Sequence, residues 1–526
     1  MGLWRALLLA LCLLGIGSVA RAQSIEPALP LLASSSYSDI EKGIETLAAS
    51  GHAHALTILQ ALADSKLFVG ADKAVIQSAD GKFTDAKSGQ AAVNAQGLTA
   101  PRVNNRIRRA IDAAMGTLTI KSPDPAKRLE AAASVFKTRD LAARPLIETA
   151  LAKETDSRVR RAFEQARAAL ILADKASDAD KLAAIAILAD RGDQDARAIL
   201  AAVNDASPAV TAAAKSAVER IDSTLAIWNA VQSVYYGISL GSVLLLAAIG
   251  LAITFGVMGV INMAHGEMVM LGAYTTFAVQ EIIRTSMPSL FDWSLAIALP
   301  LAFLVSGGVG MAIERGIIRF LYGRPLETLL ATFGLSLILQ QAVRTIFGAN
   351  NREVGNPSWM SGAFELGGLT LTYNRMWIIV FSIVVLAALM VLLRRTAFGL
   401  QMRAVTQNRR MAASMGIRTS WVDCLTFGLG SGIAGIAGVA LSQIDNVSPN
   451  LGQGYIIDSF MVVVFGGVGN LWGTLVGALS LGIANKLLEP MAGAVLGKII
   501  VLVLIVLFIQ RKPRGLFPLK GRAAEA

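Results

Sequence analysis

The sequence predicts an all-α protein in which an exported helical domain precedes a polytopic helical membrane domain. Three observations support this. The 526 residues are 54% hydrophobic and only 16% charged, with a mean hydropathy of +0.56, which is too apolar for a soluble protein of this length. Residues 23–222 nevertheless have the alanine-rich, charged composition of a soluble protein. Uncharged runs long enough to cross a bilayer occur only after them.

Residues 1–22 are typical of a secretory signal peptide. Arg5 precedes the apolar run 6–19, and the run is followed by the A-x-A cleavage pattern at 20–22. An uncleaved membrane anchor is the alternative. If the signal is cleaved, the domain that follows lies outside the membrane, which in a bacterium is the periplasm.

Residues 23–225 are predicted to form this periplasmic helical domain. Apolar residues recur at helical spacing, as at Leu182, Ile185 and Leu188. The stretch 107–110 recurs 52 residues later as 159–162, which suggests an internal repeat. Because this spacing is slightly above the ~40–47 residues of HEAT-type repeats, a HEAT-like array and an unrelated helical bundle both stay open.

Residues 226–526 contain the predicted membrane spans. A spanning helix needs about 20 apolar residues, and the uncharged runs together with the region 268–283 supply about eight of them. The runs are 223–266, 293–313, 328–343, 376–393, 424–444, 459–485 and 490–510, the last interrupted by Lys498.

The charges of the loops predict the orientation. The segment Arg394–Ser420 holds six arginines and no acidic residue, so it is assigned to the cytoplasm together with the basic tail after Gln510. A cleaved signal and a cytoplasmic C-terminus require an odd number of crossings. Division of the glycine-rich run Ser459–Asn485 into two short or re-entrant passes restores this parity and gives about nine passes. Asn350–Asn374, on the outer side, is expected to form a short hairpin.

The stretch Gly250–Tyr274 is the most unusual part of the membrane domain. Its middle contains three glycines and the polar residues Asn262 and His265, and Glu267 follows directly after Gly266. Irregular or polar backbone at membrane depth is tolerated only where protein buries it or water reaches it, and ionisable residues there suggest a function. We therefore expect Asn262, His265, Gly266 and Glu267 to line a solute pathway. The alternative is that Glu267 only caps or pins a helix.

Five stretches resemble, in order, the LivH-like permeases of ABC transporters for branched-chain amino acids. They are GLAITFGVMGVINMAHGEMVMLGAY from residue 250, TLLATFGLSLILQ from 328, AFGLQMRAVTQNRRMAASMGI from 397, FGGVGNLWGTLVGALSLGI from 465 and RKPRGLF from 511. The resemblance covers residues 232–517. The additional exported domain ahead of it resembles the long form of the urea-transporter subunit within the family.

The resemblance implies that the protein works in an assembly. The partners would be a second, LivM-like permease subunit, two ATPase subunits and a periplasmic solute-binding protein. ATP would be used by the partners, because the chain has no G-x-x-x-x-G-K-[ST] phosphate loop and is expected to bind no cofactor itself. The implied substrate is urea or a similar short amide. Branched-chain amino acids and an autonomous channel are the alternatives.

The Arg-rich segment matches the family's coupling helix, which docks in a groove of the ATPase. Its residues predict one short amphipathic helix that ends at Gly416. The alternative is a basic loop that only fixes the orientation of the chain in the membrane. The candidate coupling residues are Arg403, Asn408, Arg409, Ala412, Met415 and Gly416.

Three further expectations concern packing and binding. Gly469, Gly473 and Gly477 form a small-xxx-small pattern that allows close helix packing. His52 and His54 lack a nearby Cys or acidic cluster, and Cys12 and Cys424 lie in the signal and a span, so no metal site or disulfide is expected. The net charge of +11 is concentrated in loops between spans, which argues against a nucleic-acid partner.

Overall fold

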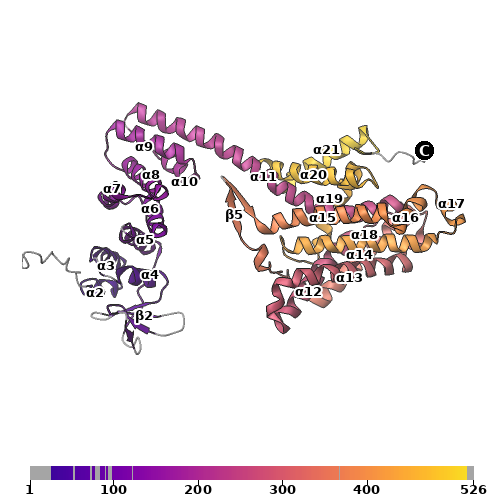
Figure 1. Cartoon of the computed structure of the whole chain (residues 1–526), viewed down its shortest axis with the longest axis horizontal. Helices are drawn as coiled ribbons and strands as arrows, with labels where there is room; N and C mark the ends of the chain where they lie inside the picture. The colour runs from indigo at the N-terminus through magenta and orange to yellow at the C-terminus, as the bar shows by residue number, and fades with distance from the viewer. Residues whose placement is uncertain are drawn as a thin grey trace, which may run out of the picture. The chain divides into compact units, whose positions relative to one another are not determined.

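The computed structural model divides into two compact units, Met1–Leu225 and Ala226–Ala526 (Figure 1). The signal peptide predicted for residues 1–22 lies outside the described part of the chain. The structure describes residues 25–50, 52, 54–70, 74–77, 83–88, 90–92, 98–120, 122–205, 207–366 and 368–517.

The first unit begins with three helices and a small sheet. The helices are α2 (Leu29–Leu32), α3 (Tyr37–Ala49) and α4 (Ala55–Ala63). The sheet is antiparallel with the order β1-β2-β3-β4, and its strands are Leu67–Val69, Ala74–Gln77, Phe83–Asp85 and Ala91–Ala92. The sequence analysis did not predict this sheet, because strands of two to four residues are too short to show an alternating pattern.

The rest of the first unit is helical. The helices are α5 (Asn105–Thr119), α6 (Pro125–Thr138), α7 (Arg144–Lys153), α8 (Ser157–Ala173), α9 (Asp178–Arg191) and α10 (Gln194–Ala201). Alanine, leucine and isoleucine side chains from α6 to the start of α11 share one hydrophobic core. The equivalent positions of the suggested repeat, Ile107 and Val159, are both fully buried, but they lie in separate cores. The HEAT-like arrangement therefore stays a prediction.

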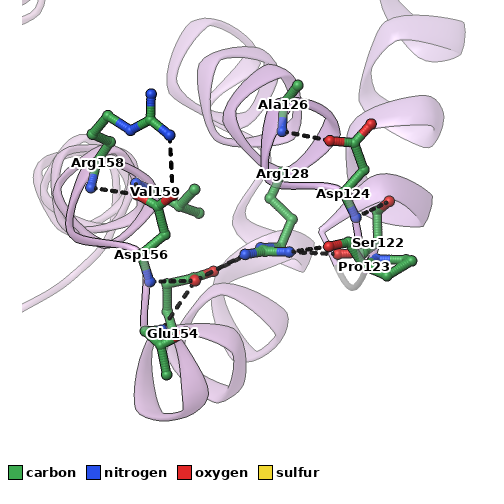
Figure 2. A network of polar contacts seen from close by, with 10 residues as sticks. Ser122, Pro123, Asp124, Ala126, Arg128, Glu154, Asp156, Arg158 and Val159 are labelled. Atoms are coloured by element: carbon green, nitrogen blue, oxygen red, sulfur yellow. Dashed lines mark hydrogen bonds and ion pairs between the residues drawn. The ribbon is translucent and has the colours of Figure 1, made fainter.

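An arginine-centred network joins α6 to the turn before α8 (Figure 2). The guanidinium group of Arg128 donates to both carboxylate oxygens of Glu154, at 2.8 and 3.0 Å. Its remaining nitrogen donates to the carbonyl oxygens of Ser122 and Pro123, both at 2.9 Å. The hydrogen bond from Arg128 lowers the pKa of Glu154 below its usual range, because it favours the ionised carboxylate.

The second unit is a bundle of long apolar helices. Seven helices of the described chain are long and apolar enough to cross a membrane. They are α11 (Pro208–Met258), α13 (Ser294–Gly316), α14 (Pro325–Phe347), α15 (Tyr373–Arg395), α18 (Thr419–Ser442), α20 (Leu471–Ala492) and α21 (Ala494–Arg511). Two more helices, α12 (His265–Ser286) and α19 (Leu451–Gly466), pack among them. The bundle confirms the predicted all-α membrane domain, and the run Ser459–Asn485 is divided between α19 and α20.

The inner helices pack through direct backbone contact. A β-carbon on Gly272 of α12 would overlap the backbone of Gly435 in α18. Likewise, a β-carbon on Gly482 of α20 would overlap the backbone of α11 at Gly237 and Gly241. Lipid gives no hydrophobic drive for helices to associate, so such close contact supplies the dispersion attraction that holds them together.

The short elements of the membrane unit lie at its two ends. At one end, the hairpin of β5 (Ala363–Leu366) and β6 (Leu369–Thr372) falls inside the stretch where a hairpin is expected. At the opposite end lie α16 (Ala397–Gln407) and α17 (Arg409–Ser414) (Figure 1). The hairpin is held to α11 by Gln232, whose side-chain amide exchanges two hydrogen bonds of 2.9 Å with the backbone of Thr370.

Candidate functional site

The predicted pathway stretch is a break between two membrane helices. α11 ends at Met258, and α12 begins only at His265. Gly259 adopts a φ of 69°, a left-handed conformation that side chains other than glycine rarely adopt. The backbone amide of Met263 in the break donates to the Thr332 hydroxyl of α14 at 3.1 Å. A neighbouring helix therefore satisfies part of this irregular backbone, and Val260, Asn262 and Ala264 of the break are buried.

Asn262 lies inside the break and is 1% exposed. Its carbonyl oxygen accepts from the backbone amide of Ala264 at 3.0 Å, whereas its amide nitrogen has no hydrogen-bond partner within the described chain. The side chain lines a cavity of about 120 Å³, together with Leu251, Ile261, Met263, Ile456, Ile457 and Phe460. The exposed lining of this cavity is almost wholly apolar, so the unpartnered amide nitrogen of Asn262 is buried beside the cavity.

His265 and Gly266 hold α12 against its neighbours. The Nε2 atom of His265 donates to the carbonyl oxygen of Ala247 in α11 at 2.9 Å, which leaves Nδ1 without a partner within the described residues. Gly266 faces Gly452 of α19, where a β-carbon on either residue would overlap the other backbone. Both residues therefore have a clear packing role, and their pathway role stays a prediction.

Glu267 is a carboxylate buried in the bundle, with 1% exposure. One oxygen accepts from the Ser336 hydroxyl at 2.8 Å and from the Gln340 amide at 2.7 Å, both on α14. The other oxygen has no partner among the described residues. Glu267 thus ties α12 to α14 through neutral donors and retains one free acceptor.

The predicted coupling segment forms two helices, whereas the sequence predicted one. Asn408 separates them, and its side chain accepts from the backbone amide of Met411 at 3.0 Å as the N-cap of α17. The single-helix prediction was wrong because Asn competes for backbone hydrogen bonds and favours such a cap. α17 ends in a Schellman motif, in which Gly416 has a φ of 86° and the amide of Ile417 donates to Ala412.

α17 is fixed to the bundle by an ion pair that the sequence analysis missed. The two terminal guanidinium nitrogens of Arg409 contact the carboxylate of Asp423, which is fully buried at the start of α18. The guanidinium also lies over the ring of Tyr322, whose hydroxyl donates to buried Glu314 at 3.3 Å. The Arg409 guanidinium therefore points toward the bundle while its side chain stays 43% exposed, and Met411 and Met415 on the same short segment are 60% and 77% exposed.

The three predicted packing glycines do not form one ladder. Gly473 and Gly477 of α20 pack on α19, near Gly466 and Val462 respectively. Gly469 instead lies in the link between α19 and α20, with a φ of 80°, and packs against Gly256 at the end of α11. Spacing in the sequence could not reveal this difference, because the helix begins only at Leu471.

A second charged pair lies on the membrane helices. Lys498 of α21 donates to Asp458 of α19 at 3.0 Å. Asp458 is largely buried, while the Lys498 side chain is 54% exposed. No sequence pattern around Lys498 indicates that a carboxylate 40 residues away faces it.

Comparison with known proteins identifies the membrane unit. Residues 233–509, more than half of the chain, match the family described as branched-chain amino acid transport system / permease component. The chain belongs to this permease family. The permease is 30% identical over 298 residues to the high-affinity branched-chain amino acid transport system permease protein BraD of Pseudomonas aeruginosa, which covers 55% of this chain and 96% of that protein. No solved structure matches it.

Other relatives agree. The permease is 31% identical over 296 residues to LivH of Escherichia coli, a match of 54% of this chain and 94% of that protein. It is 26% identical over 295 residues to a probable LivH of Methanocaldococcus jannaschii, a match of 52% of this chain and 88% of that protein. These relatives are transport permeases, which supports a multi-pass membrane permease subunit of an ABC importer.

Proposed function

We propose that this permease forms the pore of an ATP-driven importer for urea or a similar short amide. The observation that carries this proposal is the set of polar groups around the helix break. The free amide donor of Asn262 and the free carboxylate oxygen of Glu267 complement a solute that both donates and accepts hydrogen bonds. A second support is the compact unit Met1–Leu225, which lies outside the family match. It corresponds to the additional domain that resembles the long form of the urea-transporter subunit.

The test is uptake of labelled urea and labelled leucine by cells with and without this subunit. Urea uptake that requires the subunit and cellular ATP supports the proposal. Urea uptake that continues after ATP depletion would instead indicate an autonomous channel. Uptake of neither solute would refute both substrate assignments.

Branched-chain amino acids are the second candidate substrate, and one contact favours them. A zwitterion carries an ammonium and a carboxylate, and the Asp458–Lys498 pair offers a partner for each. The names of the relatives point the same way. Under this alternative, Lys498→Gln lowers leucine uptake and leaves the amount of protein in the membrane unchanged. If leucine is taken up as well by Lys498→Gln as by wild type, the pair does not recognise the solute.

We propose that the assembly contains a second permease subunit, two ATPase subunits and a periplasmic solute-binding protein. ATPase docking to α17 is supported by the exposed side chains of Met411 and Met415 on a helix that Arg409 fixes to the bundle. Gly416→Val strains the left-handed cap, at a cost of about 1–2 kcal/mol. This variant is expected to insert stably but to lose transport and co-purify less ATPase. Normal co-purification and uptake would contradict the coupling role.

The proposed orientation places the first unit in the periplasm and the C-terminus in the cytoplasm of the inner membrane. Its support is the arginine distribution, since the segment 394–420 holds six arginines and no acidic residue, and α16 and α17 contain three of them. In spheroplasts, the mature chain should begin at Gln23, and added protease should release the first unit. A chain that retains Met1 and resists the protease would contradict this orientation.

A further inference from the structure

A cleft with a volume of about 410 Å³ opens where α11, α15, α16 and the start of α20 meet. This volume lies within the roughly 300–1,000 Å³ typical of small-molecule pockets. Its apolar lining comes mainly from membrane helices, with Ala252, Ile253, Val257, Met390, Leu393, Met402 and Leu471 contributing side chains.

The charged side chains that line this cleft are both cationic. They are Arg394, one residue before the end of α15, and Arg403 on α16; among the residues that the structure describes, no Asp or Glu contributes to the lining. Arg403 donates to the carbonyl oxygen of Leu393, which holds its guanidinium beside the end of α15. Both arginines are exposed. Because Arg394 is in the last turn of a membrane span and Arg403 is hydrogen-bonded beside that turn, both lie at the depth of the membrane–water interface.

Trp472 also lines the cleft and is 52% exposed. Tryptophan is enriched at this depth, where its ring meets lipid and its N–H meets water. Asn470 and Thr406 add neutral polar groups to the lining. The cleft therefore combines an apolar wall at acyl-chain depth with two fork-shaped phosphate donors at headgroup depth.

We propose that this cleft binds one anionic phospholipid of the cytoplasmic leaflet, with its phosphate on Arg394 and Arg403. Basic pockets between membrane helices recognise acidic headgroups in this way. A free phosphate ion would leave the apolar wall uncovered. A docked ATPase would have to enter the bilayer to cover residues 252–257 of α11. The bound lipid would hold α16, and through it the coupling segment, against α11 and α20.

Native mass spectrometry of the full-length chain in neutral detergent tests this proposal. The chain is titrated with phosphatidylglycerol and with phosphatidylcholine, and glycerol 3-phosphate is added as a soluble competitor. The test variant is Arg394→Gln/Arg403→Gln. The matched control is Arg395→Gln/Arg410→Gln, which removes two exposed arginines of the same segment outside the cleft lining.

One tightly bound phosphatidylglycerol is expected in wild type and control. Loss of each arginine should weaken it roughly fivefold, and loss of both about 25-fold, with phosphatidylcholine unaffected. Equal binding of the two lipids, or an equal loss in the control, would overturn the proposal. So would displacement by glycerol 3-phosphate, which indicates a free-anion site. Unchanged lipid binding with lost ATPase association would identify a protein-docking surface instead.

A second measurement applies if the double variant fails to fold. Brominated phosphatidylglycerol should quench the fluorescence of Trp472 more strongly than brominated phosphatidylcholine. The Trp472 signal is obtained as the difference between wild type and Trp472→Phe. Equal quenching by the two lipids contradicts the proposal independently of the arginine variants.

Discussion

Helices in the two units begin in different ways. In the first unit, the backbone amides at the start of five α-helices are capped by a side chain from Asn104, Asp124, Asp156, Ser177 or Asp193. Among α12–α21 of the membrane unit, such caps occur only at Thr396, Asn408 and Asn470, at the starts of α16, α17 and α20. Side-chain capping is therefore concentrated in the first unit and, in the membrane unit, at the starts of α16, α17 and α20.

The contacts between helices also differ between the two units. Ion pairs such as Arg128–Glu154 connect helices of the first unit. In the membrane unit, neutral donors surround Glu267, and glycines bring backbones together at Gly272 and Gly435. Its interhelical ion pairs Arg409–Asp423 and Lys498–Asp458 each keep the basic side chain about half exposed. Water lowers the cost of charged groups at a protein surface, whereas lipid does not, so the interior of the membrane unit depends on backbone proximity and short polar contacts.

The strongest challenge to this comparison is an added methyl group at a backbone contact. Gly272→Ala should force α12 and α18 apart and cost about 1–3 kcal/mol or more. Gly308→Ala on α13 is the matched control, since a β-carbon there meets no atom within 4 Å. The unfolding temperature and the amount of protein in the membrane should fall for Gly272→Ala only. Equal behaviour of the two variants would mean that the contact is not stabilising.

Removal of the Arg409 side chain should have the next largest effect. Arg409→Gln leaves the buried Asp423 carboxylate without its partner, at a cost of about 1–3 kcal/mol. Arg410→Gln, which changes an exposed arginine next to it, is the control. We expect lower thermal stability and weaker ATPase co-purification for Arg409→Gln only. A double variant with Asp423→Asn should recover part of the loss, and no recovery would argue against direct coupling of the pair.

Glu267→Gln separates transport from stability. Glutamine can still accept from Ser336 and Gln340 but carries no charge. We expect unchanged assembly and an uptake reduced at least tenfold, or about 1.4 kcal/mol on the barrier. Asn262→Ala should behave in the same way if Asn262 contacts the solute. Parallel losses of membrane level and uptake would indicate a structural role, and near-normal uptake would remove both residues from the mechanism.

The smallest effect is expected for the Arg128–Glu154 pair in the first unit. Because the pKa of Glu154 is lowered on folding, the pair stabilises the unit above the unfolded pKa of about 4.3, and this stability is lost as the pH falls through the folded value. Glu154→Gln should thus lower the Tm of the full-length chain at pH 7, and the difference from wild type should shrink as the pH is lowered below about 4.3. Glu130→Gln, an exposed control on α6, should match wild type throughout.

Local residue types predicted the features that depend on local chemistry. Glycine and asparagine marked the helix break before His265, and the glycine-rich run marked the division between α19 and α20. The Gly416 cap was predicted for the same reason. The strands β1–β4 were missed because each is too short for a periodic signal.

Partners distant in the sequence could not be predicted. Glu267 is separated in the sequence from its partners Ser336 and Gln340 by 69 and 73 residues, and no pattern in either segment indicates the contact. The same holds for Asp458 and Lys498. Such pairs depend on which helix faces which, and this is decided by packing of the whole bundle.

The glycine contact between α11 and α20 has a consequence for the synthesis of the protein. α11 is the first helix of the bundle to be made, and Gly241 finds its partner Gly482 about 240 residues later. At ~5–20 residues/s, translation of this interval takes roughly 10–50 s. During that time, the face of α11 that is buried in the finished bundle must lie against lipid or an insertion factor. Folding of the membrane unit can therefore be completed only after its last helices have been synthesised.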